Sequence, residues 1–167
     1  AFGNKTLTQV ESAGMTMGDV ECFNVSGLAD GAPVYAQISK RGGKIILFDC
    51  PGSCNSQKFS ADYVTEKAQK FLTKLDIKDM KPVWINLANN VYTINFAYEK
   101  NDVIMYPDLI KVRVCAETAD VIGMEAKSYY YNHHERVAES PKISESVAKE
   151  KVNEQIKIDA VRLAVVP

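Results

Sequence analysis

Residues 109–116 alternate strictly between two kinds of side chain, and this alternation constrains the fold more than any other feature of the chain. One set is wholly apolar and the other carries two positive charges: Ile110, Val112, Val114 and Ala116 against Leu109, Lys111, Arg113 and Cys115. Successive side chains of a β-strand point to opposite faces, so the segment is predicted to be a strand with one buried face. Such strands are typical of an antiparallel sheet that packs one face on a core and leaves the other in water.

Other short apolar runs, separated by turn residues, extend this sheet along the chain. Two pairs of residues indicate tight hairpin turns, because Gly42-Gly43 and Asn89-Asn90 can take positive φ at the central positions. We expect strands at residues 6–10, 20–25, 33–39, 45–48, 83–88, 91–98, 103–106, 109–116 and 121–129.

One helix is predicted between two groups of strands, after a break rich in proline, glycine and serine at residues 51–57. Ser60 is a suitable N-cap, and Asp62 lies in the first turn, where a carboxylate favours the positive end of the helix dipole. An apolar stripe at helical spacing follows, formed by Val64, Ala68, Phe71, Leu72 and Leu75.

A weaker copy of this helix recurs near the end of the chain and indicates an internal repeat. Ser144 opens a second predicted helix that runs to about Ile156, and residues 160–166 follow as a strand. The repeat unit is one helix followed by several antiparallel strands. The chain is therefore predicted to hold a partial unit at 1–57 that lacks its helix, a complete unit at 58–140, and the start of a third unit at 141–167.

The fold class that follows is α+β, with repeated units in each of which a helix packs on an antiparallel β-sheet. An apolar sheet face left in water is unfavourable by about 25 cal/mol per Å². Because the first unit lacks a helix, we expect the helix at 144–156 to cover its sheet. The cover would come from the same chain, or by helix exchange with a second copy in a homo-oligomer.

Charge and hydropathy exclude several classes of function. The chain carries 20 basic and 21 acidic side chains and no basic stripe, so we expect no nucleic-acid partner. No apolar run approaches the roughly 20 residues that a helical membrane crossing needs, so no membrane contact is expected from this segment. The sequence contains no signal peptide, and we expect Ala1 and Pro167 to be cloning or processing boundaries.

The four cysteines do not form a dense disulfide pattern. Cys50 and Cys54 are spaced C-x-x-x-C, one residue longer than the redox motif of thioredoxin-like proteins, and Cys22 and Cys115 stand alone. Four cysteines in a chain of 167 residues are too few for a disulfide scaffold. We expect them to be reduced, or bridged only incidentally.

A more specific pattern lies in several short motifs. They are Y-P-D-L-I-K-V at 106–112, I-G-M-E-A at 122–126, N-H-x-x-R at 132–136 and I-S-K-R-G-G at 38–43. Together they resemble the C-terminal PepSY-domain region of the YpeB family of spore-germination proteins, from about residue 35 to the end. The four cysteines are not part of this pattern.

The resemblance implies PepSY units and a role in bacterial spores. YpeB-like proteins work alongside the cortex-lytic enzyme SleB, each supporting the presence or stability of the other, and PepSY modules are associated with restraining hydrolases. It also implies a location on the extracytoplasmic side of the spore inner membrane or in the cortex, with a membrane anchor elsewhere in the parent protein. No cofactor or metal is expected.

Six residues are candidates for contact with a protein partner. They are Tyr106, Pro107, Asp108, Tyr130, His133 and Arg136. Proline cannot donate to a strand ladder, so residues 106–108 are expected to form an edge, bulge or turn, which either closes locally or displays Tyr106. On a predicted strand Tyr130 would be either core or an exposed interface anchor. His133 and Arg136 serve either local hydrogen bonds or a partner.

The alternative to a binding module is an enzyme, either a hydrolase or a thiol oxidoreductase, in which a cysteine works with His133 or His134. Adjacent strand residues point to opposite faces, so the two histidines are not expected to share a metal ion. No carboxylates are paired by their spacing, and no G-x-S-x-G, H-E-x-x-H or P-loop motif occurs. We therefore predict a non-catalytic module that binds another protein.

Overall fold

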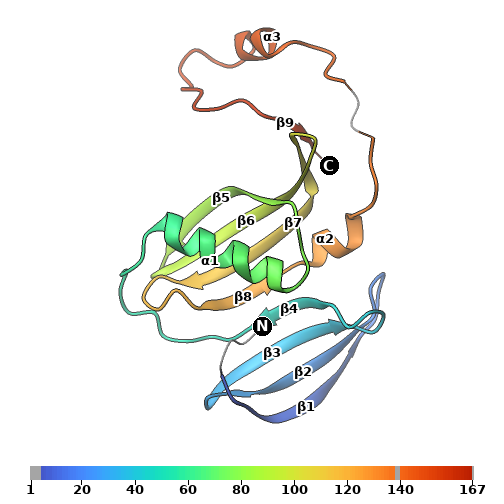
Figure 1. The fold of residues 1–167 in the computed structure, drawn as a ribbon, viewed down its shortest axis with the longest axis vertical. Coiled ribbons are helices and arrows are strands. Elements are labelled where there is room, and N and C mark those ends of the chain that lie inside the picture. Colours follow the sequence, from blue (N-terminus) through green and yellow to red (C-terminus); the bar gives the residue numbers. More distant parts are fainter. Residues whose placement is uncertain (1–4, 138–139, 167) are drawn as a thin grey trace.

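The computed structural model describes residues 5–137 and 140–166, so Ala1 and Pro167 lie outside the description (Figure 1). The architecture is α+β, as predicted. In chain order the elements are β1 (Leu7–Thr16), β2 (Cys22–Ala29), β3 (Ala32–Ser39), β4 (Ile45–Asp49), α1 (Ala61–Lys74), β5 (Met80–Ala88), β6 (Val91–Lys100), β7 (Val103–Cys115), β8 (Val121–Glu125), α2 (Lys127–Asn132), α3 (Glu145–Glu150) and β9 (Leu163–Val165). No helix of the described residues is long and apolar enough to cross a membrane.

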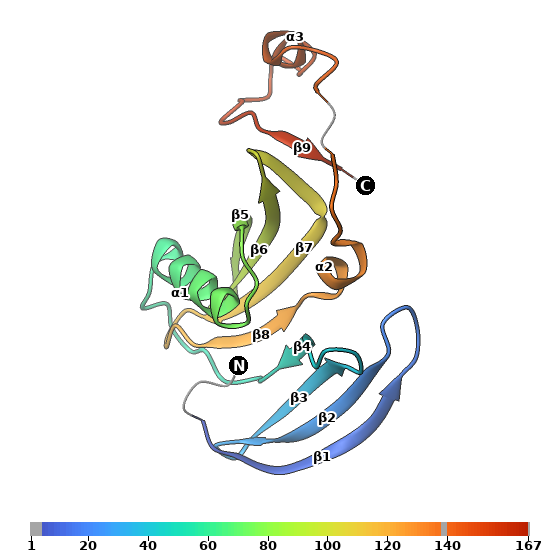
Figure 2. The same cartoon turned by 45° about the vertical axis from the view of Figure 1, so that its right-hand side comes forward.

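The strands form one sheet in which two antiparallel meanders meet edge to edge. The strand order is β1-β2-β3-β4-β8-β7-β6-β5, so the last strand of the first meander pairs with the last strand of the second (Figure 2). At this junction Phe48 lies opposite Met124 and Asp49 lies opposite Gly123. Arg113 of β7 forms an ion pair with Asp49 across β8, and a Cβ at position 123 would displace its guanidinium from this place.

Helix α1 covers the apolar face of the second meander and confirms the predicted helix. The Ser60 hydroxyl accepts a hydrogen bond from the backbone N–H of Tyr63, as an N-cap does. The predicted stripe is buried against the sheet through Val64, Ala68, Phe71 and Leu72. The Phe71 ring lies 5.6 Å from the ring of Phe48, so the core of the second meander reaches across the junction into β4.

The alternation on β7 is also confirmed, because Ile110, Val112, Val114 and Ala116 are all fully buried. Asn89 and Asn90 both have positive φ and join β5 to β6 as a two-residue hairpin, as predicted. Gly42 and Gly43 also have positive φ and lie in the longer loop between β3 and β4, which pair as a hairpin.

Two predictions for the C-terminal part are wrong. Residues 127–132 form helix α2 rather than the end of a strand, which turns the three tyrosines around a helix instead of alternating them. Helix α3 ends at Glu150 and has no buried residue, and it lies at the opposite end of the molecule from the first meander (Figure 1). It therefore does not cover that meander within the chain, and Ile156 is 60% exposed.

The C-terminal segment is held away from the first meander because β7 is longer than β8 and offers β9 a place to pair. Strand β8 pairs only with the second half of β7, at Lys111 to Val114. The first half of β7 therefore keeps a free side, where β9 pairs in parallel with Val103 to Met105.

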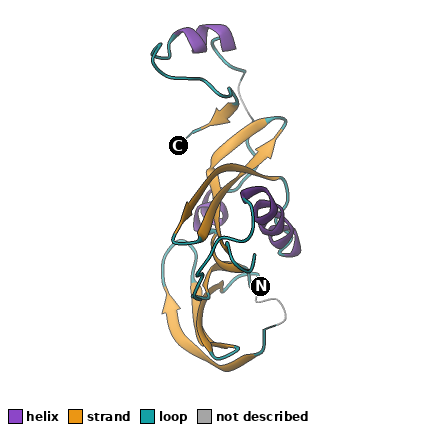
Figure 3. Ribbon diagram, turned by 90° about the vertical axis from the view of Figure 1, so that its left-hand side faces the viewer, coloured by secondary structure: helices purple, strands orange, loops and turns teal. Residues whose placement is uncertain are grey.

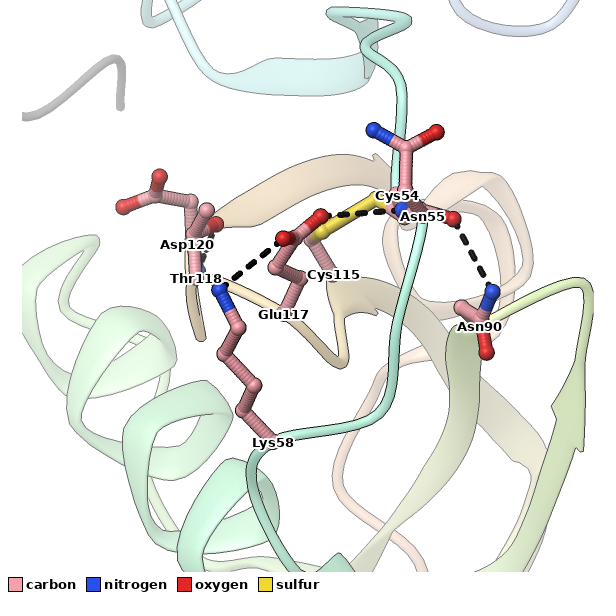
Figure 4. Close-up of a disulfide and its surroundings, with 8 residues drawn as sticks. All are labelled: Cys54, Asn55, Lys58, Asn90, Cys115, Glu117, Thr118 and Asp120. Carbon is pink, nitrogen blue, oxygen red and sulfur yellow. Dashed lines mark hydrogen bonds and ion pairs between the residues drawn. A yellow bond between two sulfur atoms is a disulfide. The ribbon is translucent and has the colours of Figure 1, made fainter.

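A disulfide joins Cys54 to Cys115, so the prediction that the cysteines are reduced is wrong for this pair (Figure 4). Cys22 and Cys50 are free and buried. The disulfide fixes the segment that leads from the first meander to α1 against the end of β7. Several hydrogen bonds reinforce it: Asn90 donates to the Cys54 carbonyl, and the N–H groups of Lys58 and Phe59 donate to the carbonyl of Ala116.

Glu117 holds the same segment from the other side of the disulfide. Its carboxylate accepts hydrogen bonds from the backbone N–H of Asn55, at 2.9 Å, and from the Lys58 ammonium, at 3.0 Å (Figure 4). These donors hold the pKa of Glu117 below its ordinary value, the backbone N–H being the larger cause. The segment before α1 is thus held against the end of β7 by a disulfide and by hydrogen bonds to the Glu117 carboxylate.

Reduction of the Cys54–Cys115 disulfide is expected to destabilise the protein. The bridge closes a loop with a sequence separation of 61 residues. Closure of a loop of this length restricts the unfolded chain by roughly 4 kcal/mol in the chain-entropy account. Chemical denaturation with and without reductant measures the difference. The C54S/C115S double variant should match the reduced protein and be insensitive to reductant, whereas equal midpoints for oxidised and reduced wild type would contradict the bridge.

Candidate partner-binding site

Of the edge, bulge or turn expected at residues 106–108, the strand register shows a bulge in the middle of β7. Tyr98 of β6 pairs with Met105, and its neighbour Ala97 pairs with Leu109, so residues 106–108 have no partner on β6. Pro107 lacks the N–H that a continuous ladder would use, which accounts for the interruption at this position.

The bulge brings Asp108 together with two of the predicted residues from beyond α2. Asp108 is completely buried. Its Oδ2 accepts hydrogen bonds from Nδ1 of His133 and from Nη1 of Arg136, each at 2.8 Å. An ionised carboxylate can only accept, so the Nδ1 of His133 is the donor in this pair. We call these three residues the Asp108 cluster.

Asn132, the last residue of α2, completes the attachment of this segment to the bulge. Its side-chain amide donates to the carbonyls of Pro107, at 3.1 Å, and Ser128, at 2.9 Å. Its own carbonyl accepts from the Arg136 guanidinium and lies 2.6 Å from Nδ1 of His134. The segment after α2 is therefore fixed to the bulge through side chains on both partners.

Aromatic rings hold the His133 imidazole in place. It stacks on Tyr129 with ring centroids 4.5 Å apart, and it meets Tyr98 edge-on at 4.6 Å. Burial is the main cause that raises the pKa of Tyr129, and the nearby Asp108 carboxylate adds to it. Tyr129 is thus a neutral, partly desolvated platform for His133.

The other candidates do not join the Asp108 cluster. Tyr106 is partly exposed on the bulge. Tyr130 instead lines a cavity of about 510 Å³ formed with the two loops that follow β1 and β3, among them Glu21, Lys40 and Lys44. Burial raises the pKa of Tyr130 as well.

The Asp108 cluster attaches the segment after α2 to the bulge of β7, and we call this attachment the latch. A buried carboxylate is tolerated when hydrogen-bond donors pair with it, and here the imidazole and the guanidinium both donate to Oδ2. Oδ1 of Asp108 has no hydrogen-bond partner among the described residues. Within residues 5–137 and 140–166 no three His, Cys, Asp or Glu side chains gather as metal ligands would.

The exposed apolar residues of β5 were not among the predicted binding residues. This strand is one edge of the main path of the sheet. Trp84 is 53% exposed, and Ile85 and Leu87 are also exposed. The signal was available, because Trp84 is the single tryptophan of the chain and lies in an alternating run.

A family assignment is possible from the sequence of these elements. Residues 5–139, from before β1 to beyond the Asp108 cluster, match the family described as YpeB sporulation, PepSY1 and PepSY2 domains. The chain belongs to the YpeB sporulation protein family. The resemblance seen in the short motifs is confirmed, and so is the α+β fold with PepSY domains.

Relatives from three bacteria agree with the assignment to the YpeB family. Sporulation protein YpeB of Halalkalibacterium halodurans is 33% identical over 135 residues, which cover 81% of this chain and 30% of that protein. The Bacillus subtilis protein of the same name is 26% identical over 165 residues, covering 98% and 37%. The Bacillus megaterium YpeB C-terminal domain superposes with a TM-score of 0.85 at 26% identity, covering 98% of this chain and 73% of that one.

The chain spans about a third of the length of these curated relatives. It is a sporulation protein by family, and its disulfide is typical of proteins exposed to an oxidising compartment.

Removing the charge of Asp108 should destabilise the protein strongly. The Asp108→Ala variant leaves the guanidinium of Arg136 without its partner in a largely buried place, which costs about 3 kcal/mol by analogy with other buried pairs. Glu135→Ala is the matched control, because Glu135 pairs with Lys100 at the exposed surface, where such pairs contribute about 0–1 kcal/mol. Urea unfolding measures both, and equal small effects would show that the latch carries no stability.

Proposed function

We propose that this chain is a non-catalytic protein-binding module that acts with a SleB-type cortex-lytic hydrolase of the bacterial spore, by stabilising or restraining it. Its place would be the extracytoplasmic side of the spore inner membrane, or the cortex, as part of a membrane-anchored parent protein. Membership of the YpeB family supports the role in sporulation. The surface of β5 supports the binding of a protein.

The observation that carries the proposal is the edge strand β5. Beyond Lys81 and Pro82, which discourage pairing at its start, this strand exposes Trp84, Ile85 and Leu87. Soluble proteins usually protect an apolar edge, since its free backbone groups and side chains invite another strand. Tryptophan is also enriched among the residues that dominate binding energy at interfaces.

Both faces of the sheet contribute at this edge. Trp84 lies opposite Asn95, whereas Ile85 lies opposite the core residue Ile94 and so faces the side that carries α1. A partner that adds a strand to β5 would therefore contact Trp84 on one face and Ile85 with Leu87 on the other.

The alternative of a thiol enzyme is less well supported by the side-chain environments. Nδ1 of His133 is engaged by Asp108, and two of the four cysteines form the disulfide. Burial is the main cause that raises the pKa of the Cys22 thiol, which opposes formation of the nucleophilic thiolate. The predicted roles of Tyr106 and Tyr130 in binding a partner stay predictions.

Binding to the hydrolase should depend on Trp84. We expect Trp84→Ala in the full-length protein to weaken the affinity for a purified SleB-type enzyme by at least about tenfold, as loss of an interface anchor does. Tyr131→Ala is the matched control, since Tyr131 is an exposed aromatic residue on α2, away from β5. It should leave the affinity within about twofold, within the usual range of surface substitutions. Equal affinities for wild type and Trp84→Ala would place the interface elsewhere, and no binding by the wild type would refute the partner.

Thiol labelling separates the binding module from the enzyme. Cys22 and Cys50 are each 3% exposed, so both should react with a maleimide only when the protein unfolds. Mass spectrometry of the labelled native protein at neutral pH measures this. One rapidly modified cysteine in the native state would favour the thiol enzyme instead.

A further inference from the structure

A cavity of about 510 Å³ lies where the first meander meets α2, and its size is that of ordinary small-molecule sites. Its walls are the turn at residues 18–21, residues 39–41 with Lys44 of the next loop, Ile46 of β4 and Tyr130 of α2. The helices, purple in Figure 3, lie above the first meander, and α2 contacts it at β4. The cavity is therefore built jointly by the two meanders.

Hydrogen bonds hold the two loops in place, so the cavity is preformed. The backbone N–H of Lys40 donates to the Glu21 carbonyl at 2.8 Å, and the two side chains form an ion pair at 3.0 Å. Within the second loop the nearly buried Ser39 hydroxyl donates to the Arg41 carbonyl at 2.7 Å and accepts from the N–H of Lys44 at 2.9 Å.

The charges around the cavity are not fully paired. Three basic and two acidic side chains line it, so one positive charge is in excess. Lys40 and Glu21 pair with each other, whereas neither Arg41 nor Lys44 forms an ion pair with another described residue. Asp19 is the acidic group that remains. A guanidinium presents a fork of donors that fits a carboxylate, so Arg41 and Lys44 together favour an anionic ligand.

Tyr130 adds a neutral donor and an apolar wall. Burial raises the pKa of Tyr130, so the phenol stays protonated and can donate a hydrogen bond. Among the described residues none accepts from its hydroxyl, and its ring meets Tyr129 edge-on at 5.3 Å, which fixes its orientation. Val20 and Ile46 extend the apolar surface beside the ring.

We propose that this cavity binds a carboxylate carried by an apolar body, either a free organic acid or the C-terminus of a peptide that ends in an apolar residue. Arg41 and Lys44 pair with the carboxylate, and the body packs on Val20, Ile46 and the ring of Tyr130. The single excess positive charge matches a carboxylate, whereas a phosphate monoester carries about −1.5 to −2 at neutral pH. This site is separate from the β5 edge and does not depend on the proposed hydrolase partner.

Saturation-transfer NMR with the full-length protein tests the proposal, with N-acetyl-L-phenylalanine as the probe. The acid should bind at least about tenfold more tightly than its primary amide, because only the acid forms charge-assisted hydrogen bonds. A glycine-rich, N-acetylated pentapeptide that ends in phenylalanine separates the two sources. If the peptide acid binds as well as the small acid, the site admits a chain terminus, and if only the small acid binds, the ligand is a free acid. Equal binding of acid and amide would overturn the proposal.

Two variants of opposite sign test the residues. Arg41→Gln should weaken binding of the acid by about tenfold, through loss of a charge-assisted pair. Asp19→Asn should tighten it by about twofold or more, because a like charge is removed. Arg162→Gln is the matched control, since Arg162 is also an exposed arginine but lies beside β9, and its effect should stay within about twofold.

The variants also separate this site from the β5 edge. Arg41 is exposed, so its replacement is not expected to impair folding. Trp84→Ala should leave the affinity for the acid within about twofold of wild type, whatever its effect on a protein partner. Wild-type affinity in Arg41→Gln, or weaker binding in Asp19→Asn, would refute the assignment of the carboxylate to this cavity.

Discussion

The pairing of β4 with β8 is the interaction on which the rest of the structure depends. It joins two meanders that are separate in sequence into one sheet, through backbone hydrogen bonds such as Cys50 N–H to the Ile122 carbonyl and Ala126 N–H to the Ile46 carbonyl. Because Phe48 and Met124 meet there on the buried side, one apolar face runs through the junction. The same pairing places the outer strands of the first meander beside α1 and leaves β5 as the opposite edge.

Local features of this fold were predictable from the sequence, and its long-range contacts were not. The alternation of residues 109–116, the N-cap at Ser60 and the turn at Asn89-Asn90 each depend on neighbours in the chain, so pattern and propensity suffice. The pairing partner of β4 was not predictable, because nothing in the sequence of Ile45–Asp49 specifies β8. The Cys54–Cys115 bridge is also a long-range contact. In the sequence, Cys54 stands out instead for its C-x-x-x-C spacing from Cys50.

The candidate site shows the same division. Proline in Y-P-D predicted an interruption of the strand, as an edge, bulge or turn, because the missing N–H is a local property. The convergence of Asp108 with His133 and Arg136 depends on α2, whose three consecutive tyrosines favour a strand by propensity. Residues 127–129 were therefore predicted to end a strand, whereas the structure shows a helix that packs on β7. The run around Trp84 could be read from the sequence, but its place at an edge of the sheet follows only from the order of the strands.

Native-state hydrogen exchange at the junction tests the central claim most directly. If the two meanders form one cooperative sheet, the amides of Cys50 and Ala126, which bond across β4 and β8, should exchange with an opening free energy equal to that of the central strands β6 and β7. Opening of these two amides at a much lower free energy, while β6 and β7 stay protected, would show that the first meander unfolds independently and would contradict the account.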